Sequence, residues 1–174
     1  MPVNIHSFAI AVAAAVLSVT ASGARSAETA PEPESTDPLA PFERLVGGRW
    51  SIEGSYQEFE WGLGRRSVKA RSYFVVDGEP ILVSEGMWYW SPAEERIRGV
   101  FTAIEMPVVH FDYTTRFEGD VMLNELRSYD ADGGETVYEE TWEFTDDDHF
   151  LWKLFRKTAD GLKEEMGGTF SRSE

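Results

Sequence analysis

The sequence of 174 residues contains no cysteine. This absence excludes disulfides, thiol catalysis, zinc or iron–sulfur sites built on cysteine, and a lipid attached to a cysteine. The fold must therefore be held by its hydrophobic core, and a chain of this length can bury one. The length fits one folded domain.

Basic residues are also scarce, with 16 Lys and Arg against 31 Asp and Glu and a net charge of −15. Nucleic acids and anionic membrane surfaces both attract clustered cations. We therefore expect no nucleic-acid partner, and no membrane contact for the mature form. Aromatic residues, in contrast, are plentiful and include 6 Trp, which indicates a core, a cavity or an interface built from rings.

Catalytic and metal-binding motifs are missing as well. The chain has no Gly-x-Ser-x-Gly, no phosphate loop and no His-Glu-x-x-His. His110 and Asp112 remain as weak catalytic candidates, a base and its orienting carboxylate. The acidic segments 130–135 and 145–149 are more typical of hairpin loops than of calcium sites, so no metal is expected. The sequence therefore favours a protein that is not an enzyme.

The N-terminus predicts export. Residues 8–19 form an apolar run that is too short to span a bilayer, and small residues follow it. This pattern predicts a secretory signal peptide over residues 1–27, with cleavage after Ala24 or Ala27 and a periplasmic or secreted mature chain. Residues 28–37 predict a disordered linker rich in Pro and Glu, and residues 38–174 a single folded domain.

The folded domain predicts one short helix followed only by strands. Asp37 can cap a helix over 38–46, Pro38 suits its first position, and Gly47 or Gly48 can end it. Strand-like runs follow, separated by short turn segments, at 49–60, 66–76, 80–90, 96–104, 108–117, 121–129, 136–145, 150–158 and 162–172.

The spacing of these runs predicts the fold class. The gaps are too short for a crossover helix, so consecutive strands must pair antiparallel. A meander of this kind closes most economically into a barrel, which removes its free edges. The predicted fold is therefore all-β, an antiparallel up-and-down meander barrel of nine or ten strands preceded by a short N-terminal helix.

A short motif at the first strand resembles a known superfamily. Gly48-Arg49-Trp50 after a short helix, with Arg172 in the last strand, is similar to the calycins, which include lipocalins, fatty-acid-binding proteins and nitrobindins. The nearest resemblance is to uncharacterised lipocalin-like domains of exported bacterial proteins. It implies that Gly48 lets the strand bend and that Trp50 plugs the closed end of the barrel under Arg172. Nitrobindins hold haem through a histidine near the C-terminus. No histidine follows His149 here, so no cofactor is expected.

Side chains alternate along strands, so counting from Trp50 across each turn assigns them to two faces. A mixed face of rings and charges gathers Trp50, Tyr56, Glu58, Arg71, Tyr73, Ser84, Trp88, Trp90, Arg98, Thr102, His110, Asp112, Glu125, Arg127, Tyr138, Glu140, Trp142, Trp152, Arg156, Glu164 and Arg172. An apolar face gathers Phe74, Ile81, Val83, Met87, Ile97, Phe101, Val109, Phe111, Tyr113, Phe117, Met122 and Leu126. Either the mixed face lines a lumen, or the apolar face is the core and the mixed face is solvated with cross-strand ion pairs.

These two interpretations lead to different functions. A mixed lumen predicts a lipocalin-like domain that binds a small ligand, anionic or aromatic. Its expected binding residues are Arg71, Trp88, Arg98, His110, Arg127 and Trp142. The alternatives are a homodimeric interaction module without a ligand and an accessory enzyme that uses His110 and Asp112.

Overall fold

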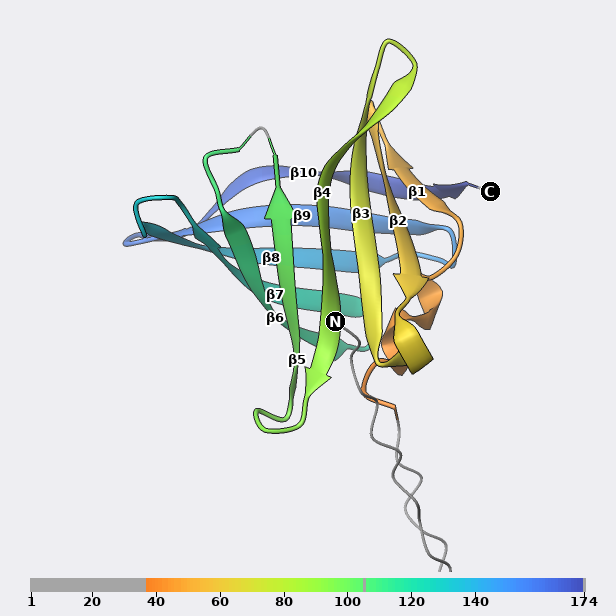
Figure 1. Ribbon diagram of the computed structural model, residues 1–174, viewed down its shortest axis with the longest axis horizontal. Coiled ribbons are helices and arrows are strands. Elements are labelled where there is room, and N and C mark those ends of the chain that lie inside the picture. The colour runs from red at the N-terminus through yellow and green to blue at the C-terminus, as the bar shows by residue number, and fades with distance from the viewer. Residues whose placement is uncertain (1–36, 105, 174) are drawn as a thin grey trace, which may run out of the picture. The chain divides into compact units, whose positions relative to one another are not determined.

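The computed structural model describes residues 37–104 and 106–173. The predicted signal peptide and almost all of the predicted linker lie outside the described residues. The described residues contain two short 3-10 helices and ten strands (Figure 1). The elements are η1 (Ala40–Arg44), β1 (Arg49–Ile52), β2 (Ser55–Trp61), η2 (Leu63–Arg65), β3 (Ser67–Val76), β4 (Glu79–Ser91), β5 (Arg96–Ala103), β6 (His110–Glu118), β7 (Val121–Tyr129), β8 (Glu135–Phe144), β9 (His149–Thr158) and β10 (Gly161–Ser173).

All ten strands form one closed barrel. Each strand pairs antiparallel with its neighbours in sequence, and β1 closes the ring by pairing with β10. The predicted all-β meander barrel is therefore confirmed, and its architecture is consistent with a calycin-like fold. The segment expected as a helix over 38–46 contains the shorter 3-10 helix η1. No helix in the described part of the chain is long and apolar enough to cross a membrane.

One predicted strand is wrong, because the run 49–60 is a hairpin. Glu53 and Gly54 make a two-residue turn between β1 and β2, with Gly54 at a φ of 71°. The turn pairs Trp50 with Gln57, so Gln57 shares the inner face with Trp50 and Tyr56 does not. As one continuous strand, the run 49–60 predicts that Tyr56 lies on the same face as Trp50.

Further one-residue differences in pairing affect the other strands. A bulge shifts the register of β3 against β4 between Ser72 and Tyr73, and the β4–β5 connection pairs Ser91 with Arg96. A shift of one residue moves every later side chain to the opposite face. The predicted mixed face is consequently divided in the structure, with part of it inside the barrel and part outside. Most of the predicted apolar face on β5, β6 and β7 lies inside.

The barrel has two different ends. The end with η1, η2 and the β4–β5, β6–β7 and β8–β9 turns is called the closed end here. The opposite end, with the β1–β2, β3–β4, β5–β6, β7–β8 and β9–β10 connections, is called the open end. At the closed end, aromatic rings pack continuously around the buried Trp50, Phe42 and Phe150. At the open end, the β3–β4 hairpin extends beyond its neighbours (Figure 1).

Candidate functional site at the open end of the barrel

Burial decreases steadily along the inner face of β9. Phe150 at the closed end is 0% exposed, whereas Trp152 and Leu154 are only partly buried. Arg156, the next residue on the same face, has a side chain that is 48% exposed. Strand β10 shows the same gradient, from the buried Phe170 to Met166, which is 54% exposed and pairs with Leu154. The inner face is therefore packed at one end and reached by solvent at the other.

The β3–β4 hairpin also has exposed side chains on its inner face. Phe74 and Ile81 pair with each other, and Phe74 also pairs with Ser55, which shares the inner face of β2 with Gln57. Phe74 is 53% exposed, and Ile81 is exposed as well. Large apolar side chains on an inner face are normally covered by the core. Here they line the entrance of the barrel and remain in contact with water.

One wall of the open end contains a pocket of about 500 Å³. Ser128, Thr136 and Tyr138 come from the inner faces of β7 and β8. The remaining lining comes from two connections, residues 106–109 of the β5–β6 loop and residues around Asp130 in the β7–β8 turn. Hydroxyl groups, a phenol ring and apolar loop side chains together suit a small ligand with an apolar body.

A buried polar network lies between the packed end and the solvated end. The Asn124 amide donates to Oε2 of Glu140 over 2.8 Å, and the Trp152 indole donates to Oε1 of Glu140 over 2.6 Å. Thr115 donates its hydroxyl proton to Asn124 over 2.6 Å. The network spans β6, β7, β8 and β9 and holds Glu140 in one position on the inner face.

Burial governs the titration of this network. Desolvation raises the pKa of the Glu140 carboxyl, and the donated hydrogen bonds only partly offset it. Burial, together with the nearby Glu140, also raises the pKa of Tyr113 well above its usual value. The phenol of Tyr113 therefore stays neutral, and Glu140 is the buried carboxyl among the residues that the structure describes.

The core also contains polar atoms that the protein itself does not satisfy. The indole N–H groups of Trp88 and Trp142 and the side-chain oxygen of Gln57 are buried and have no hydrogen-bond partner within the described residues. Trp88 and Trp142, both predicted as ligand contacts, lie in the packed core, with their ring centres 6.3 Å apart. They lie deeper than the solvated part of the inner face.

The three predicted closed-end residues lie together. The Arg172 guanidinium is 4.5 Å from the centre of the Trp50 ring, and the Trp50 indole donates to the Leu45 carbonyl over 2.9 Å. Arg172 also donates to the Gly47 carbonyl over 3.1 Å and to the Arg44 carbonyl. At Gly48, which has a φ of 73°, an added Cβ would lie 3.1 Å from the Ser173 carbonyl oxygen. These contacts attach the η1 segment to the closed end of the barrel.

The predicted arginine contacts lie outside the barrel. Arg98 alternates with the buried Ile97, and its guanidinium pairs with Glu94 over 3.1 Å. Arg127 alternates with the buried Leu126 and pairs with two glutamates, whose hydrogen bond and charges raise its pKa. Arg71 pairs with Glu60 over 3.3 Å. The structure therefore does not bring these three arginines together in one lumen.

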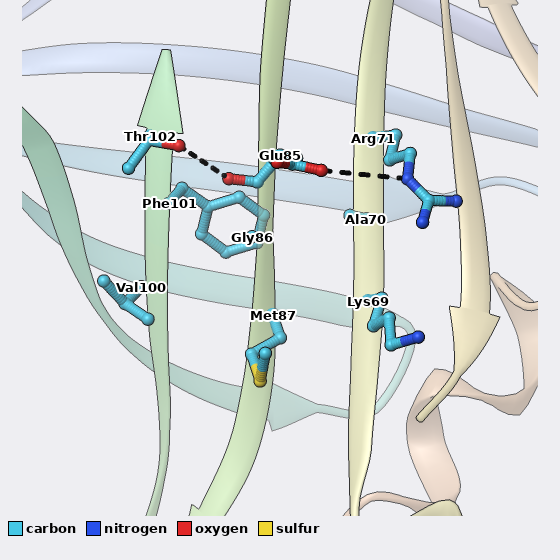
Figure 2. Close-up of a pocket in the computed structure, with 9 residues that line it drawn as sticks. All are labelled: Lys69, Ala70, Arg71, Glu85, Gly86, Met87, Val100, Phe101 and Thr102. Carbon is cyan, nitrogen blue, oxygen red and sulfur yellow. Dashed lines mark hydrogen bonds and ion pairs between the residues drawn. The ribbon is translucent and has the colours of Figure 1, made fainter. Parts of the chain in front are cut away.

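Arg71 does line a hollow, but on the outer face of the barrel. Figure 2 shows this groove, of about 360 Å³, across β3, β4 and β5. Gly86 forms the floor of the groove, and the Phe101 ring packs directly beneath it. A Cβ at Gly86 would come within 2.5 Å of this ring, so only glycine fits there. Met87 and Val100 supply apolar walls, and the nearby Arg71 is 3.9 Å from Glu85. The groove is a second, shallower candidate for ligand contact.

The catalytic candidates also face outward. His110 stacks on Tyr129, with ring centres 4.8 Å apart, and Asp112 lies across from Arg127 on β7. Within the residues that the structure describes, no hydrogen bond joins His110 to Asp112. The same residues contain no group of three or more side chains arranged to hold a metal ion.

Sequence reasoning missed the polar network around Glu140 as a site. Glu140 was placed on the mixed face but not among the site residues, and Asn124 and Trp152 were not singled out as a group. The available signal was the pattern Tyr138-x-Glu140-x-Trp142, which puts one carboxylate between two rings on the same strand face. The hydrogen bonds to this carboxylate come from strands on both sides, which the pattern does not reveal.

Comparison with known proteins adds no family assignment. No protein-family model matches the chain, and no curated protein matches it significantly.

Proposed function

We propose that the chain is a binding protein that holds a small, largely apolar molecule inside the open end of its barrel. The observation that carries the proposal is the apolar surface left accessible on the inner faces of two hairpins at the open end. Phe74 and Ile81 supply it on β3 and β4, and Leu154 and Met166 supply it on β9 and β10. A ligand that covered this surface would gain about 25 cal/mol for each Å² of apolar area removed from water. The pocket beside Tyr138 supplies polar groups that can orient such a ligand.

We also propose a structural class for the protein and a cellular location. A calycin-type, lipocalin-like domain is supported by the meander barrel, by the segment η1 at the closed end and by the contact between Trp50 and Arg172. Export to the periplasm or the medium is supported by the sequence pattern of residues 1–27. An anionic ligand is less well supported, because Arg71, Arg98 and Arg127 face outward and are paired with glutamates.

The proposal can be tested by titration with N-phenyl-1-naphthylamine, a neutral apolar dye whose fluorescence increases in apolar sites that exclude water. Met166→Lys places a charge on the inner face at the open end, and we expect it to weaken dye binding at least about tenfold, because covering a charge with an apolar ligand is costly. Met87→Lys is the matched control, since Met87 is also exposed but lines the outer groove. Loss of binding in Met87→Lys with normal binding in Met166→Lys would move the site to the outer groove. No dye binding by the wild type would contradict the proposal.

A second candidate function is homodimeric association without a ligand. The observation that favours it is the protruding β3–β4 hairpin, whose large side chains are exposed on both faces, including Phe74, Val75, Val76, Ile81 and Leu82. Exposed apolar patches of this kind can mark interaction surfaces as well as ligand-binding sites. Native mass spectrometry separates the two functions. A dimer mass that persists on dilution to low micromolar concentration supports association, and a monomer that carries a copurified small molecule supports ligand binding.

A further inference from the structure

Glu140 is a carboxylate buried without a cation. Its residue is 6% exposed, and both its oxygens accept hydrogen bonds from neutral groups, those of Asn124 and Trp152. None of the ion pairs within the described residues includes it. Buried charges in proteins are almost always paired with an opposite charge or a metal. The network therefore satisfies the hydrogen bonds of this carboxylate but not its charge.

The register of the strands places Glu140 next to the solvated surface. Glu140 pairs with Leu154 on β9, and Leu154 pairs with Met166 on β10. Exposure along this row falls from 54% at Met166, through the half-buried Leu154, to 6% at Glu140. A ligand lying on Leu154 and Met166 would therefore have Glu140 at its inner end.

Aromatic rings surround the same position. Trp152 is held in place by its hydrogen bond to Glu140, and Tyr113 lies near enough for the carboxylate to raise its pKa. Tyr138, two residues from Glu140 on the same face of β8, lines the pocket at the open end. The faces of aromatic rings attract cations, particularly where water is excluded. A carboxylate with rings around it suits an organic cation better than an anion.

We propose that the ligand of the barrel is an apolar primary amine whose ammonium group pairs with Glu140 while its apolar body lies on Leu154 and Met166. This inference rests on the proposed binding function and names the chemical class of its ligand. The ammonium would supply the missing counter-charge and donate a charge-assisted hydrogen bond to the carboxylate. The net charge of −15 also favours the approach of cations over anions.

The test uses two probes that share one skeleton, 3-phenylpropylamine and 3-phenylpropan-1-ol, titrated by calorimetry at pH 7 into the purified protein. We expect the amine to bind more tightly than the alcohol to the wild type. In Glu140→Gln we expect amine affinity to fall by about 10- to 100-fold, the usual range for a hydrogen bond to a charged group, while alcohol affinity changes little.

Glu139→Gln is the matched control. Glu139 precedes Glu140 on β8 and faces the opposite side, across from Glu125, so the variant removes the same charge from outside the barrel. An equal loss of amine affinity in both variants would show a general field effect and overturn the inference. If Glu140→Gln does not fold, the wild type still decides, because amine affinity should fall more than alcohol affinity as the carboxyl is protonated at acidic pH.

The remaining outcomes separate this inference from the proposed function. Equal affinity of the wild type for the amine and the alcohol, with the neutral dye still binding, overturns the amine inference and leaves the apolar site standing. Failure of the amine, the alcohol and N-phenyl-1-naphthylamine to bind overturns the proposed function itself. Tighter binding of the amine that Glu140→Gln does not change would place the ammonium at another carboxylate and also overturn the inference.

Discussion

The two ends of the barrel are built from the same strands but treat their inner faces in opposite ways. At the closed end the inward side chains of β9 and β10 begin at Phe150 and Phe170, which stack on each other with ring centres 4.9 Å apart. At the open end the same faces carry Arg156 and Met166, which are exposed. The comparison indicates that the closed end buries the apolar side chains that stabilise the fold, whereas the open end leaves apolar surface exposed to water.

The largest expected effect compares one residue from each end. Trp50→Ala removes a fully buried ring, its hydrogen bond to Leu45 and its contact with Arg172. We expect it to lower the free energy of unfolding by about 3–5 kcal/mol, the usual range for an aromatic residue truncated in a core. Met166→Ala at the open end should change it by about 0.5 kcal/mol or less, because the side chain is already exposed.

Urea unfolding followed by tryptophan fluorescence and circular dichroism measures both variants. Circular dichroism is needed because Trp50 is itself a fluorophore in the wild type. Comparable losses in the two variants would show that the open end contributes to stability as much as the closed end does. The division between the two ends would then be wrong.

An intermediate effect is expected from two glycine variants that test how tightly β1 and β10 are joined at the closed end. Gly47 and Gly48 both have positive φ, at 81° and 73°. An added Cβ would meet nothing within 4 Å at Gly47, but at Gly48 it would lie 3.1 Å from the Ser173 carbonyl oxygen. Gly47→Ala should therefore cost about 1 kcal/mol for the backbone conformation alone. Gly48→Ala should cost about 1 kcal/mol more for the close contact.

Thermal unfolding of the two glycine variants gives this difference directly. Because both substitutions add the same methyl group at the same kind of backbone conformation, the strain term nearly cancels between them. Equal midpoints would mean that β1 and β10 separate without cost at this point. In that case the contact between Gly48 and the last strand does not hold the closed end together.

The architecture of the barrel could be predicted from the sequence because its signals are local. Turn segments such as Asp77-Gly78 and Asp160-Gly161 separate the strands, and short gaps require antiparallel pairing. The closed end was also open to prediction, because Trp50 and Arg172 belong to a short recognisable pattern. Both features depend on residues close in sequence or on a familiar motif.

The open end could not be predicted, because it depends on register. The turn at Gly54 and the bulge at Ser72 each shift the pairing by one residue, and neither carries a strong turn signal. Each shift exchanges the inner and outer faces of the strands that follow. The pairing of Ser91 with Arg96 at the β4–β5 connection adds one more shift, so Arg98 and Arg127 were expected in the lumen and lie outside it. Glu140 was placed on the correct face, but its partners on β7 and β9 depend on the same registers.

The smallest expected effect at any one pH concerns Glu140, at the border between the two ends. Burial raises its pKa above the ordinary value of 4.5, so the folded protein keeps the proton at a pH where the unfolded chain has released it. Its contribution to stability is complete below pH 4.5 and is lost as the pH rises through the raised folded pKa. Urea unfolding between pH 4.5 and 8 should therefore show wild type losing stability relative to Glu140→Gln, whose amide does not titrate.

Glu139→Gln, on the outer face, controls for the loss of one charge. A difference between wild type and Glu140→Gln that stays constant with pH would mean that Glu140 is solvated like a surface carboxylate. The border between the packed and the solvated ends would then lie deeper in the barrel than Glu140.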